Sequence, residues 1–213
     1  MSNISDMREN YDRSTLDEQH VDSDAMKQFN SWFQEAIDED VVEPNAMIMS
    51  TINSDGHPTS RTLLLKGVED GGFVFYTNYN SDKGKEIAAN PNISLLFLWK
   101  KVQRQVRISG IAHKIPKEQS EAYFHSRPKG SQIGAWVSPQ SQVIANKDIL
   151  ETRKAELIEQ YKDDDELPLP EFWGGYKMKP QKIEFWQGRP NRLHDRLLYT
   201  LVDRKWKIER LAP

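Results

Sequence analysis

AMIMSTINSDGHPTSRTLLLKGVEDGGFVFYT, residues 46–77, contains three apolar runs separated by two turn sequences. The runs, rich in β-branched and aromatic residues typical of strands, are Ala46–Ile52, Thr59–Lys66 and Phe73–Thr77. Asn53-Ser54-Asp55-Gly56 separates the first two runs, and Asp70-Gly71-Gly72 separates the second two. Because Asp, Asn and Gly favour tight turns, the passage predicts two successive hairpin connections in an antiparallel sheet.

Helix and strand patterns continue on both sides of this passage. Upstream, apolar residues at three- and four-residue steps predict a helix that is capped by Ser23 or Asp24 and ends before Pro44. These apolar residues are Met26, Phe29, Trp32, Phe33, Ala36 and Ile37. Downstream, strands are predicted at Ile93–Trp99, Gln103–Lys114, Gln181–Gln187, Leu197–Val202 and Trp206–Leu211. Helices are predicted from Ser81 to before Pro91, from Pro116 to about Ser126, at Ser131–Val137 and at Lys147–Tyr161.

The arrangement of these elements indicates the fold class. Many short antiparallel strands with helices in their connections predict a mainly β (α+β) protein, a small β-barrel with peripheral helices. The glycine pair Gly174-Gly175 is predicted to form a turn. A length of 213 residues suits a single domain, which we expect at residues 25–213.

Residues 1–24 differ in composition from this domain. From Asp6 to Asp24 there are seven acidic residues and two arginines, with hardly an apolar residue in register. The composition predicts a mobile N-terminal arm. Whether the arm has a role or is only a tail is open at this point.

Composition excludes several classes of function. The 29 basic and 32 acidic residues give a net charge of −3, which argues against a nucleic-acid-binding protein. The longest apolar run, Ile93–Trp99, is far shorter than the roughly 20 residues that cross a membrane. The absence of cysteine excludes disulfides and thiolate chemistry, and no histidine pair has the spacing of a metal site. With no secretory signal pattern at the N-terminus, we expect a cytoplasmic protein without a metal.

The strand Arg61–Lys66 carries a basic residue at each end. Alternation sends Arg61 and Lys66 to opposite faces, so the strand contacts two separate anions or simply carries two surface charges.

A second group of candidate residues follows Pro116, where Tyr123 and Arg127 are four residues apart on one helical face and Ser131 is placed to cap the next helix. These groups would converge on a phosphate, although an ordinary helix end with a capping serine explains them equally well.

The densest feature is IEFWQGRPNRLHDR, Ile183–Arg196, in which aromatic and basic residues alternate across a strand, a turn and a second strand. Arg192 and His194 share a face, and Arg196 follows them. A hairpin with a surface salt bridge is one interpretation. Because guanidinium groups both pair with anions and stack on rings, the alternative is a site for an anionic, planar ligand.

This run, I-E-F-W-Q-x(4)-R-L-H-D-R, resembles the signature of the pyridoxine (pyridoxamine) 5′-phosphate oxidase family, FMN enzymes that make pyridoxal 5′-phosphate. The resemblance extends from about Arg61 to Pro213. It includes, in the family's order, R-T-L-L-L-K, F-Y-T-N, R-Q-V-R-I-S-G, Y-F-H-S-R-P, S-Q-I-G-A-W-V-S, F-W-G-G and R-L-A-P. It implies an FMN-binding split β-barrel that forms a homodimer with two FMN sites between the subunits. The implied substrates are pyridoxamine 5′-phosphate, pyridoxine 5′-phosphate and O₂.

The resemblance also implies roles for individual residues. The implied cofactor-binding residues are Arg61, Thr62, Leu63, Leu64, Leu65, Lys66, Tyr76, Thr77, Lys83, Gln105, Gln140, Ser141, Trp186 and Arg196. Among them, Arg61 and Lys83 would pair with the FMN phosphate, and Gln105, Trp186 and Arg196 would come from the partner subunit. The implied substrate-binding residues are Lys66, Tyr123, Arg127 and Ser131 at the phosphate, Arg192 and His194 at the pyridine ring, and Arg8 and Tyr11 in the arm. Arg192 and His194 are also the implied catalytic pair.

Two departures and two alternatives accompany this resemblance. Many family members carry Arg where this chain has Asp82, and a carboxylate beside a phosphate is repulsive unless it points away. The arm matches the family only at Arg8 and Tyr11. The alternatives are a flavin reductase on the same fold and a non-catalytic module that binds flavin or pyridoxal phosphate.

Overall fold

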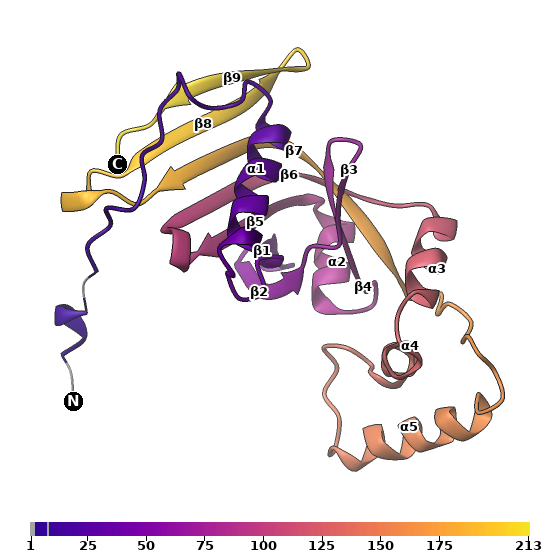
Figure 1. The fold of residues 1–213 in the computed structure, drawn as a ribbon. Coiled ribbons are helices and arrows are strands. Elements are labelled where there is room, and N and C mark those ends of the chain that lie inside the picture. Colours follow the sequence, from indigo (N-terminus) through magenta and orange to yellow (C-terminus); the bar gives the residue numbers. More distant parts are fainter. Residues whose placement is uncertain (1–2, 8) are drawn as a thin grey trace.

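The computed structural model describes residues 3–7 and 9–213. Within these residues nine strands form one antiparallel sheet, ordered β2-β1-β5-β6-β7-β4-β3, with β8 beside β7 and β9 beside β8. The strands are β1 Ala46–Ile52, β2 Pro58–Leu64, β3 Gly67–Glu69, β4 Gly72–Asn78, β5 Asn92–Trp99, β6 Arg104–Lys114, β7 Trp173–Gln187, β8 Asp195–Val202 and β9 Lys205–Arg210 (Figure 1). The prediction of a mainly antiparallel β fold is confirmed.

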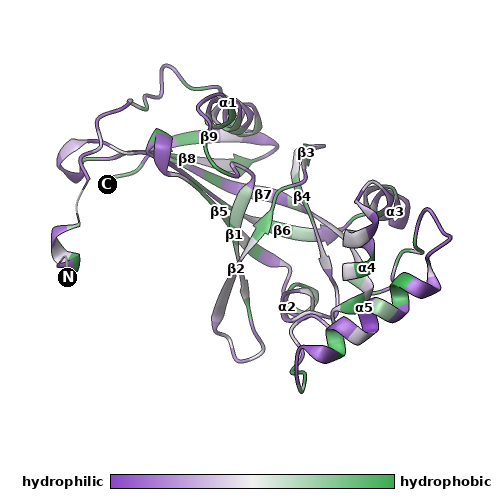
Figure 2. Ribbon diagram, turned by 60° about the horizontal axis from the view of Figure 1, so that its bottom comes forward, coloured by the Kyte–Doolittle hydropathy of each residue, from purple (hydrophilic) through white to green (hydrophobic). Residues whose placement is uncertain are grey.

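Helices occupy the connections, as predicted. They are α1 Ala25–Asp38, α2 Asp82–Ala89, α3 Lys117–His125, α4 Lys129–Val137 and α5 Asp148–Gln160, with short 3₁₀ turns η1 Ile4–Asp6, η2 Lys100–Val102 and η3 Pro190–Arg192. Asp24 caps α1 by accepting from the amides of Met26 and Lys27, and Ser81 caps α2. Figures 1 and 2 both show α3, α4 and α5 gathered at the end of the molecule far from the two chain termini. None of the helices in the described part of the chain is long and apolar enough to cross a membrane.

The sheet curls because its two ends are joined through the chain. The strands at the ends of the main order, β2 and β3, are consecutive in sequence, and only Leu65 and Lys66 lie between them. The Leu65 amide donates to the Asn45 carbonyl at 2.8 Å, and the Lys66 amide donates to the Val74 carbonyl at 2.8 Å. These two residues therefore transfer the chain from one sheet edge to the other, which gives a half-barrel.

The same crossing corrects one prediction. The strand predicted at Thr59–Lys66 ends at Leu64, and its hairpin partner is β1 alone. The second hairpin instead joins the short strand β3 to β4. The switch occurs because Leu65 turns into the core, where it is 5% exposed.

A second correction concerns β7, which begins at Trp173 rather than near Gln181. Gly174 and Gly175 lie inside this strand and do not form a turn. A Cβ atom at Gly174 would collide with the Tyr79 hydroxyl, and one at Gly175 would collide with the Ile115 side chain. The glycines are thus needed for close approach within a strand. Further along the strand, Pro180 lies opposite Gly110, beside the irregularity where a missing ladder donor is tolerated.

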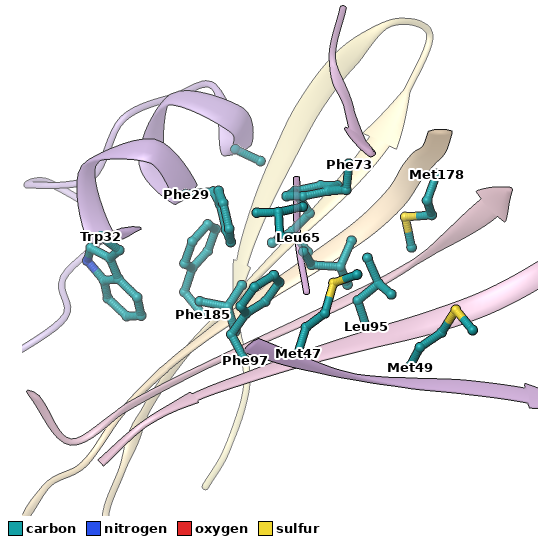
Figure 3. Packing of buried hydrophobic residues seen from close by; sticks show 14 of the residues in the cluster. Phe29, Trp32, Met47, Met49, Leu65, Phe73, Leu95, Phe97, Met178 and Phe185 are labelled. Atoms are coloured by element: carbon teal, nitrogen blue, oxygen red, sulfur yellow. The ribbon is translucent and has the colours of Figure 1, made fainter. Parts of the chain in front are cut away.

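The main core lies between α1 and one face of the sheet (Figure 3). Phe29 of α1 packs edge-on against Phe73, with ring centroids 4.9 Å apart, and Trp32 packs edge-on against Phe185 at 5.1 Å. Hydrophilic and hydrophobic residues alternate around α1 (Figure 2), so one side of the helix is available for this packing. A second, smaller cluster unites α3 and α4 with the first residue of β7.

Two buried tyrosines provide a test of this core. Tyr199 donates to the Asp22 carbonyl at 2.8 Å, whereas the Tyr176 hydroxyl has no hydrogen-bond partner among the described residues. Burial raises the pKa of Tyr176 to about 12. Because an unpaired buried hydroxyl contributes nothing, we expect Tyr176→Phe to keep or raise the free energy of unfolding. We expect Tyr199→Phe to lower it by about 1 kcal/mol.

Urea unfolding of both variants at one protein concentration measures this difference. An equal loss of stability in the two variants would show that the Tyr176 hydroxyl is satisfied after all.

Candidate functional site

Two clefts contain most of the predicted site residues. The first, which we call the basic cleft, has a volume of about 410 Å³. Its lining residues are Thr62, Leu63, Leu64, Lys66, Tyr76, Thr77, Lys83, Tyr123, Arg127, Gln140 and Trp173. All of them except Trp173 were predicted as site residues. Strands β2 and β4, helices α2 and α3, and the start of β7 therefore bring together residues that are far apart in the sequence.

One end of the basic cleft lies at the N-terminus of α2. Lys83 is half-buried there, and its Nζ donates to Gln140 Oε1 at 3.0 Å. Burial, and next the charge of Arg61, lower the pKa of Lys83. Ser141 accepts from the backbone amide of Asp82 at 3.2 Å. A helix N-terminus with a partly desolvated cation is a favourable place for an anion, because the anion restores the solvation that the ammonium lost.

Arg61 and Asp82 lie beside this region but do not line the cleft. The Arg61 guanidinium pairs with Glu86 at 2.9 Å and also donates to the hydroxyls of Thr51 and Thr59. It remains close enough to Lys83 to lower the pKa of that ammonium. The Asp82 side chain is exposed in the first turn of α2. Leu65 also stays outside the cleft because its side chain lies in the core.

The other end of the basic cleft is built around Arg127. Its guanidinium lies 4.9 Å from the centroid of the Trp173 ring, and its buried Nη1 atom has no hydrogen-bond partner among the described residues. Burial lowers the pKa of Arg127. Beside it, the rings of Tyr76 and Tyr123 are stacked with centroids 3.8 Å apart. A half-buried guanidinium whose buried Nη1 is unpaired favours an anionic ligand.

Ser131 differs from its prediction in one respect. It is the third residue of α4 rather than the cap, which is Pro128. It lies with Arg127 in a cavity of about 210 Å³ that adjoins the basic cleft. Nearby, the buried side chain of Gln132 donates to the Arg127 carbonyl at 2.9 Å and accepts from the Leu167 amide at 3.0 Å. Sequence reasoning missed this support because nothing in the spacing of Gln132 distinguishes it from a surface residue.

The second cleft, which we call the arm cleft, has a volume of about 720 Å³. It is lined by Met7, Glu9, Asn10, Tyr11, Arg189, Asn191, Arg192 and His194. Arg192, His194 and Tyr11 were predicted, and Arg8 lies outside the described residues. Arg189 was missed as a site residue, although it belongs to the dense run Ile183–Arg196 that singled out this region.

The surroundings of His194 favour one tautomer of its neutral ring. The Arg189 backbone amide donates to His194 Nδ1 at 3.1 Å, and the Trp186 ring lies 4.6 Å away. Since a backbone N–H can only donate, Nδ1 is unprotonated, and the neutral ring carries its proton on Nε2. Burial, and next the charge of Arg192, lower the pKa of His194. Arg192 itself has a left-handed backbone with φ of 63°.

Three further predicted residues form a row across the sheet. Gln105 lies opposite Trp186, and Trp186 lies opposite Arg196. Directly opposed residues share a face, and this face points away from the core. Arg196 donates from Nε to Glu184 at 2.8 Å and from Nη1 to the Ala212 carbonyl at 2.8 Å. The same outward face exposes large apolar side chains, including Ile48 and Leu98.

The two clefts are far apart in one chain. Trp173, which lines the basic cleft, begins β7, whereas Trp186, which contacts His194, lies near the end of that strand. At about 3.3 Å per residue, the 13 steps between them span roughly 40 Å. Figure 1 shows α3 and α4 at one end of β7 and the connection to β8 at the other. Within a single chain, Arg127 and Ser131 therefore do not meet Arg192 and His194, in keeping with the expectation of sites between two subunits.

Fold and clefts together define a split-barrel protein with a cleft lined by basic and aromatic side chains. A family model described as pyridoxamine 5′-phosphate oxidase matches residues 33–161. A second, described as pyridoxine 5′-phosphate oxidase C-terminal dimerisation region, matches residues 173–213. The chain belongs to the pyridoxine/pyridoxamine 5′-phosphate oxidase family, which confirms the resemblance found in the sequence.

Individual relatives agree with this assignment. The chain is 50% identical to the pyridoxine/pyridoxamine 5′-phosphate oxidase of Salinibacter ruber and 51% identical to that of Paraburkholderia phytofirmans, over all of both chains in each case. Among solved structures, PhzG from Burkholderia lata in complex with tetrahydrophenazine-1-carboxylic acid superimposes with a TM-score of 0.87 at 28% identity, covering 94% of this chain and 98% of that one. An FMN-binding protein of Nostoc punctiforme has the same fold, with a TM-score of 0.69 at 18% identity, covering 94% of this chain and all of that one.

The environment of His194 makes stability depend on pH. Its pKa is lowered in the folded state, so between the folded pKa and about 6.5 the unfolded chain binds more protons. The contribution of His194 is thus complete above about pH 6.5 and is lost as pH falls through the folded pKa. We expect the wild type to lose more stability between pH 7.5 and 5.5 than a His194→Gln variant, which cannot titrate.

Urea unfolding of both proteins at these two pH values checks this expectation. The other four histidines are common to both proteins, so they cancel in the comparison. Parallel losses in the two proteins would contradict the assigned environment of His194.

Proposed function

We propose that this chain is an FMN-dependent oxidase that converts pyridoxine 5′-phosphate or pyridoxamine 5′-phosphate into pyridoxal 5′-phosphate. The observation that carries this proposal is about 50% identity over the full length with curated oxidases of that name. The basic cleft supports it, because an anion-binding site of this size suits a phosphorylated ligand.

The residues of the basic cleft fit a flavin nucleotide, the cofactor of this family. Lys83, Gln140, Ser141 and the N-terminus of α2 offer donors to its phosphate, and Arg61 adds positive charge behind them. The Asp82 side chain is exposed, so solvent screens the repulsion that its sequence position suggested, while its charge still acts on Lys83. Residues 62–66, together with Tyr76 and Thr77, would contact the rest of the cofactor.

Bound FMN would accept a hydride from C4′ of the substrate and deliver the electrons to O₂, which yields H₂O₂. The alcohol substrate and O₂ then give the aldehyde and H₂O₂. The amine substrate, O₂ and water give the aldehyde, ammonia and H₂O₂. The task of the chain is to hold the reacting carbon within about 3–3.5 Å of the cofactor.

A second phosphate site would supply much of that orientation. Arg127 carries a buried, unpaired N–H, and Lys66, Tyr123 and Ser131 lie around it. Binding energy gained at the phosphate lies remote from the reacting carbon and can therefore be used to position it. Arg192 would orient the pyridine ring, and His194 would donate from Nε2, because its Nδ1 is occupied by the Arg189 amide. Arm residues Arg8 and Tyr11 would close over this ring.

A homodimer reconciles this scheme with the separation of the two clefts. The region matched by the dimerisation model, residues 173–213, includes Trp186, Arg192, His194 and Arg196. We infer that the outward face of the sheet packs against a second copy. The arm cleft of one subunit, with Gln105, Trp186 and Arg196, would then meet the basic cleft of the other. The expected cytoplasmic location stays a prediction.

An aerobic assay tests the function. The purified protein with FMN should convert both phosphorylated substrates to the aldehyde and release H₂O₂, while unphosphorylated pyridoxine should react poorly. Bleaching of the flavin by NADH alone would favour the reductase, and bound flavin without turnover would favour the non-catalytic module.

An Arg192→Leu variant should lose turnover while it keeps its FMN content; loss of FMN instead would assign Arg192 to cofactor binding.

Complementation tests the shared site. Arg127→Ala and Arg192→Leu should each be nearly inactive, because each damages both sites of its own dimer. After mixing, unfolding and refolding at equal amounts, about a quarter of wild-type activity should return. The reason is that about half of the dimers are mixed, and each mixed dimer holds one intact site out of two. Activity that stays at the level of the single variants would place both residues in a site made by one chain.

A further inference from the structure

Tyr11 is one of the arm residues that line the arm cleft. A Cβ atom at Gly188 would lie 2.7 Å from Tyr11 Cγ, so the Tyr11 ring rests directly on the Gly188 backbone. The ring centroid is 5.9 Å from that of Trp186 and 5.9 Å from that of His194. Tyr11 therefore forms a wall of the cleft beside the residue that we expect to contact the substrate ring.

The Tyr11 side chain contacts its neighbours by ring packing, against Trp186 and His194. No hydrogen bond to Tyr11 is formed by any of the residues at 3–7 or 9–213, so its place depends on the backbone that follows it. The next two amides, of Asp12 and Arg13, both donate to the side-chain oxygen of Gln103, each at 3.1 Å. Gln103 is 90 residues away from Arg13 in the sequence.

Gln103 also holds the surface on which Tyr11 lies. Its backbone carbonyl accepts from the Gly188 amide at 2.8 Å and from the buried side chain of Gln187 at 3.2 Å. Its backbone is left-handed, with φ of 55° and ψ of 40°, which allows the side chain and the carbonyl to serve both partners. Gln103 thus hydrogen-bonds both to the backbone that follows Tyr11 and to Gly188, against which the Tyr11 ring packs.

The other arm contacts come from the Arg13 side chain or lie further along the chain. The ion pair of Arg13 with Glu39 is over a third exposed on both sides, so it adds little. The Ser14 carbonyl accepts from Arg189 at 2.9 Å, and the Leu16 amide donates to Asp195 at 3.1 Å. These contacts fasten the arm to the body, whereas those of Gln103 lie closest to Tyr11.

We propose that Gln103 is a positioning residue, which holds the arm so that Tyr11 stays against His194 in the substrate-binding cleft. The proposal rests on the proposed function in one respect, namely that the arm cleft receives the substrate ring. Gln103 lines neither the arm cleft nor the basic cleft. Its loss should therefore weaken substrate binding more than it slows the chemical step.

A matched pair of variants tests this role. Gln103→Met keeps the length of the side chain without the acceptor, and Gln103→Glu keeps an acceptor for both amides. Loss of two hydrogen bonds should raise the KM for pyridoxine 5′-phosphate about tenfold in Gln103→Met, with a much smaller change in kcat and unchanged FMN content. Gln103→Glu should lie close to the wild type. If Gln103→Glu is impaired as strongly as Gln103→Met, the acceptor has no role and the proposal is wrong.

A double-mutant cycle separates positioning from a general structural effect. Tyr11→Ala should raise KM as well, and the double variant Tyr11→Ala/Gln103→Met should be no worse than Tyr11→Ala, because Gln103 acts through Tyr11. Effects that multiply would show that Gln103 acts by another route.

Limited trypsin digestion gives a readout that needs no oxidase activity. Cleavage after Arg13 should be faster in Gln103→Met than in the wild type, and equal cleavage rates would overturn the anchoring. If the wild type shows no oxidase activity while the cleavage rates differ as expected, the proposed function fails and the anchoring role stands.

Discussion

The length of one strand sets the architecture of the site. Strand β7 has 15 residues and carries Trp173, which lines the basic cleft, at its start and Trp186, a ring neighbour of His194, near its end. A strand of that length is stiff and cannot fold its ends together. A ligand that needs groups from both ends must therefore receive them from two copies of the chain. The outward sheet face, with its exposed apolar residues, is the surface on which such copies can pack.

Cations of the described residues differ in their partners. Arg104, Arg107 and Arg210 each pair with a carboxylate. Arg127 and Lys83 are also partly buried, yet neither has an ion-pair partner among the described residues. Burial without a counter-charge is unfavourable in the folded protein alone, and a bound phosphate offsets that cost. The contrast points to the basic cleft as the place where anions bind.

Much of the fold was predictable because its signals are local. The helix at 25–38, the strands β4, β5 and β6, and the cap at Ser81 follow from periodicity and turn residues within short windows. Where the prediction was wrong, a distant neighbour decides the outcome. Gly174 and Gly175 resemble a turn in sequence, but they pair with β4 in a strand, where Tyr79 and Ile115 leave no room for a Cβ atom. Leu65 ends its strand because the sheet edges meet there.

The features of the site also fall into those that the sequence determined and those that only the tertiary structure decided. From the sequence alone one could determine the family and most residues of the basic cleft, because motif chemistry is carried by residue type and spacing. Only the tertiary structure decided that Arg61 faces Glu86, that His194 keeps Nδ1 unprotonated, and that Gln103 reaches the arm. These facts depend on the direction of side chains and on contacts between residues up to 91 positions apart. The spacing of residues along a chain does not contain that information, since it arises only when the sheet curls and brings its edges together.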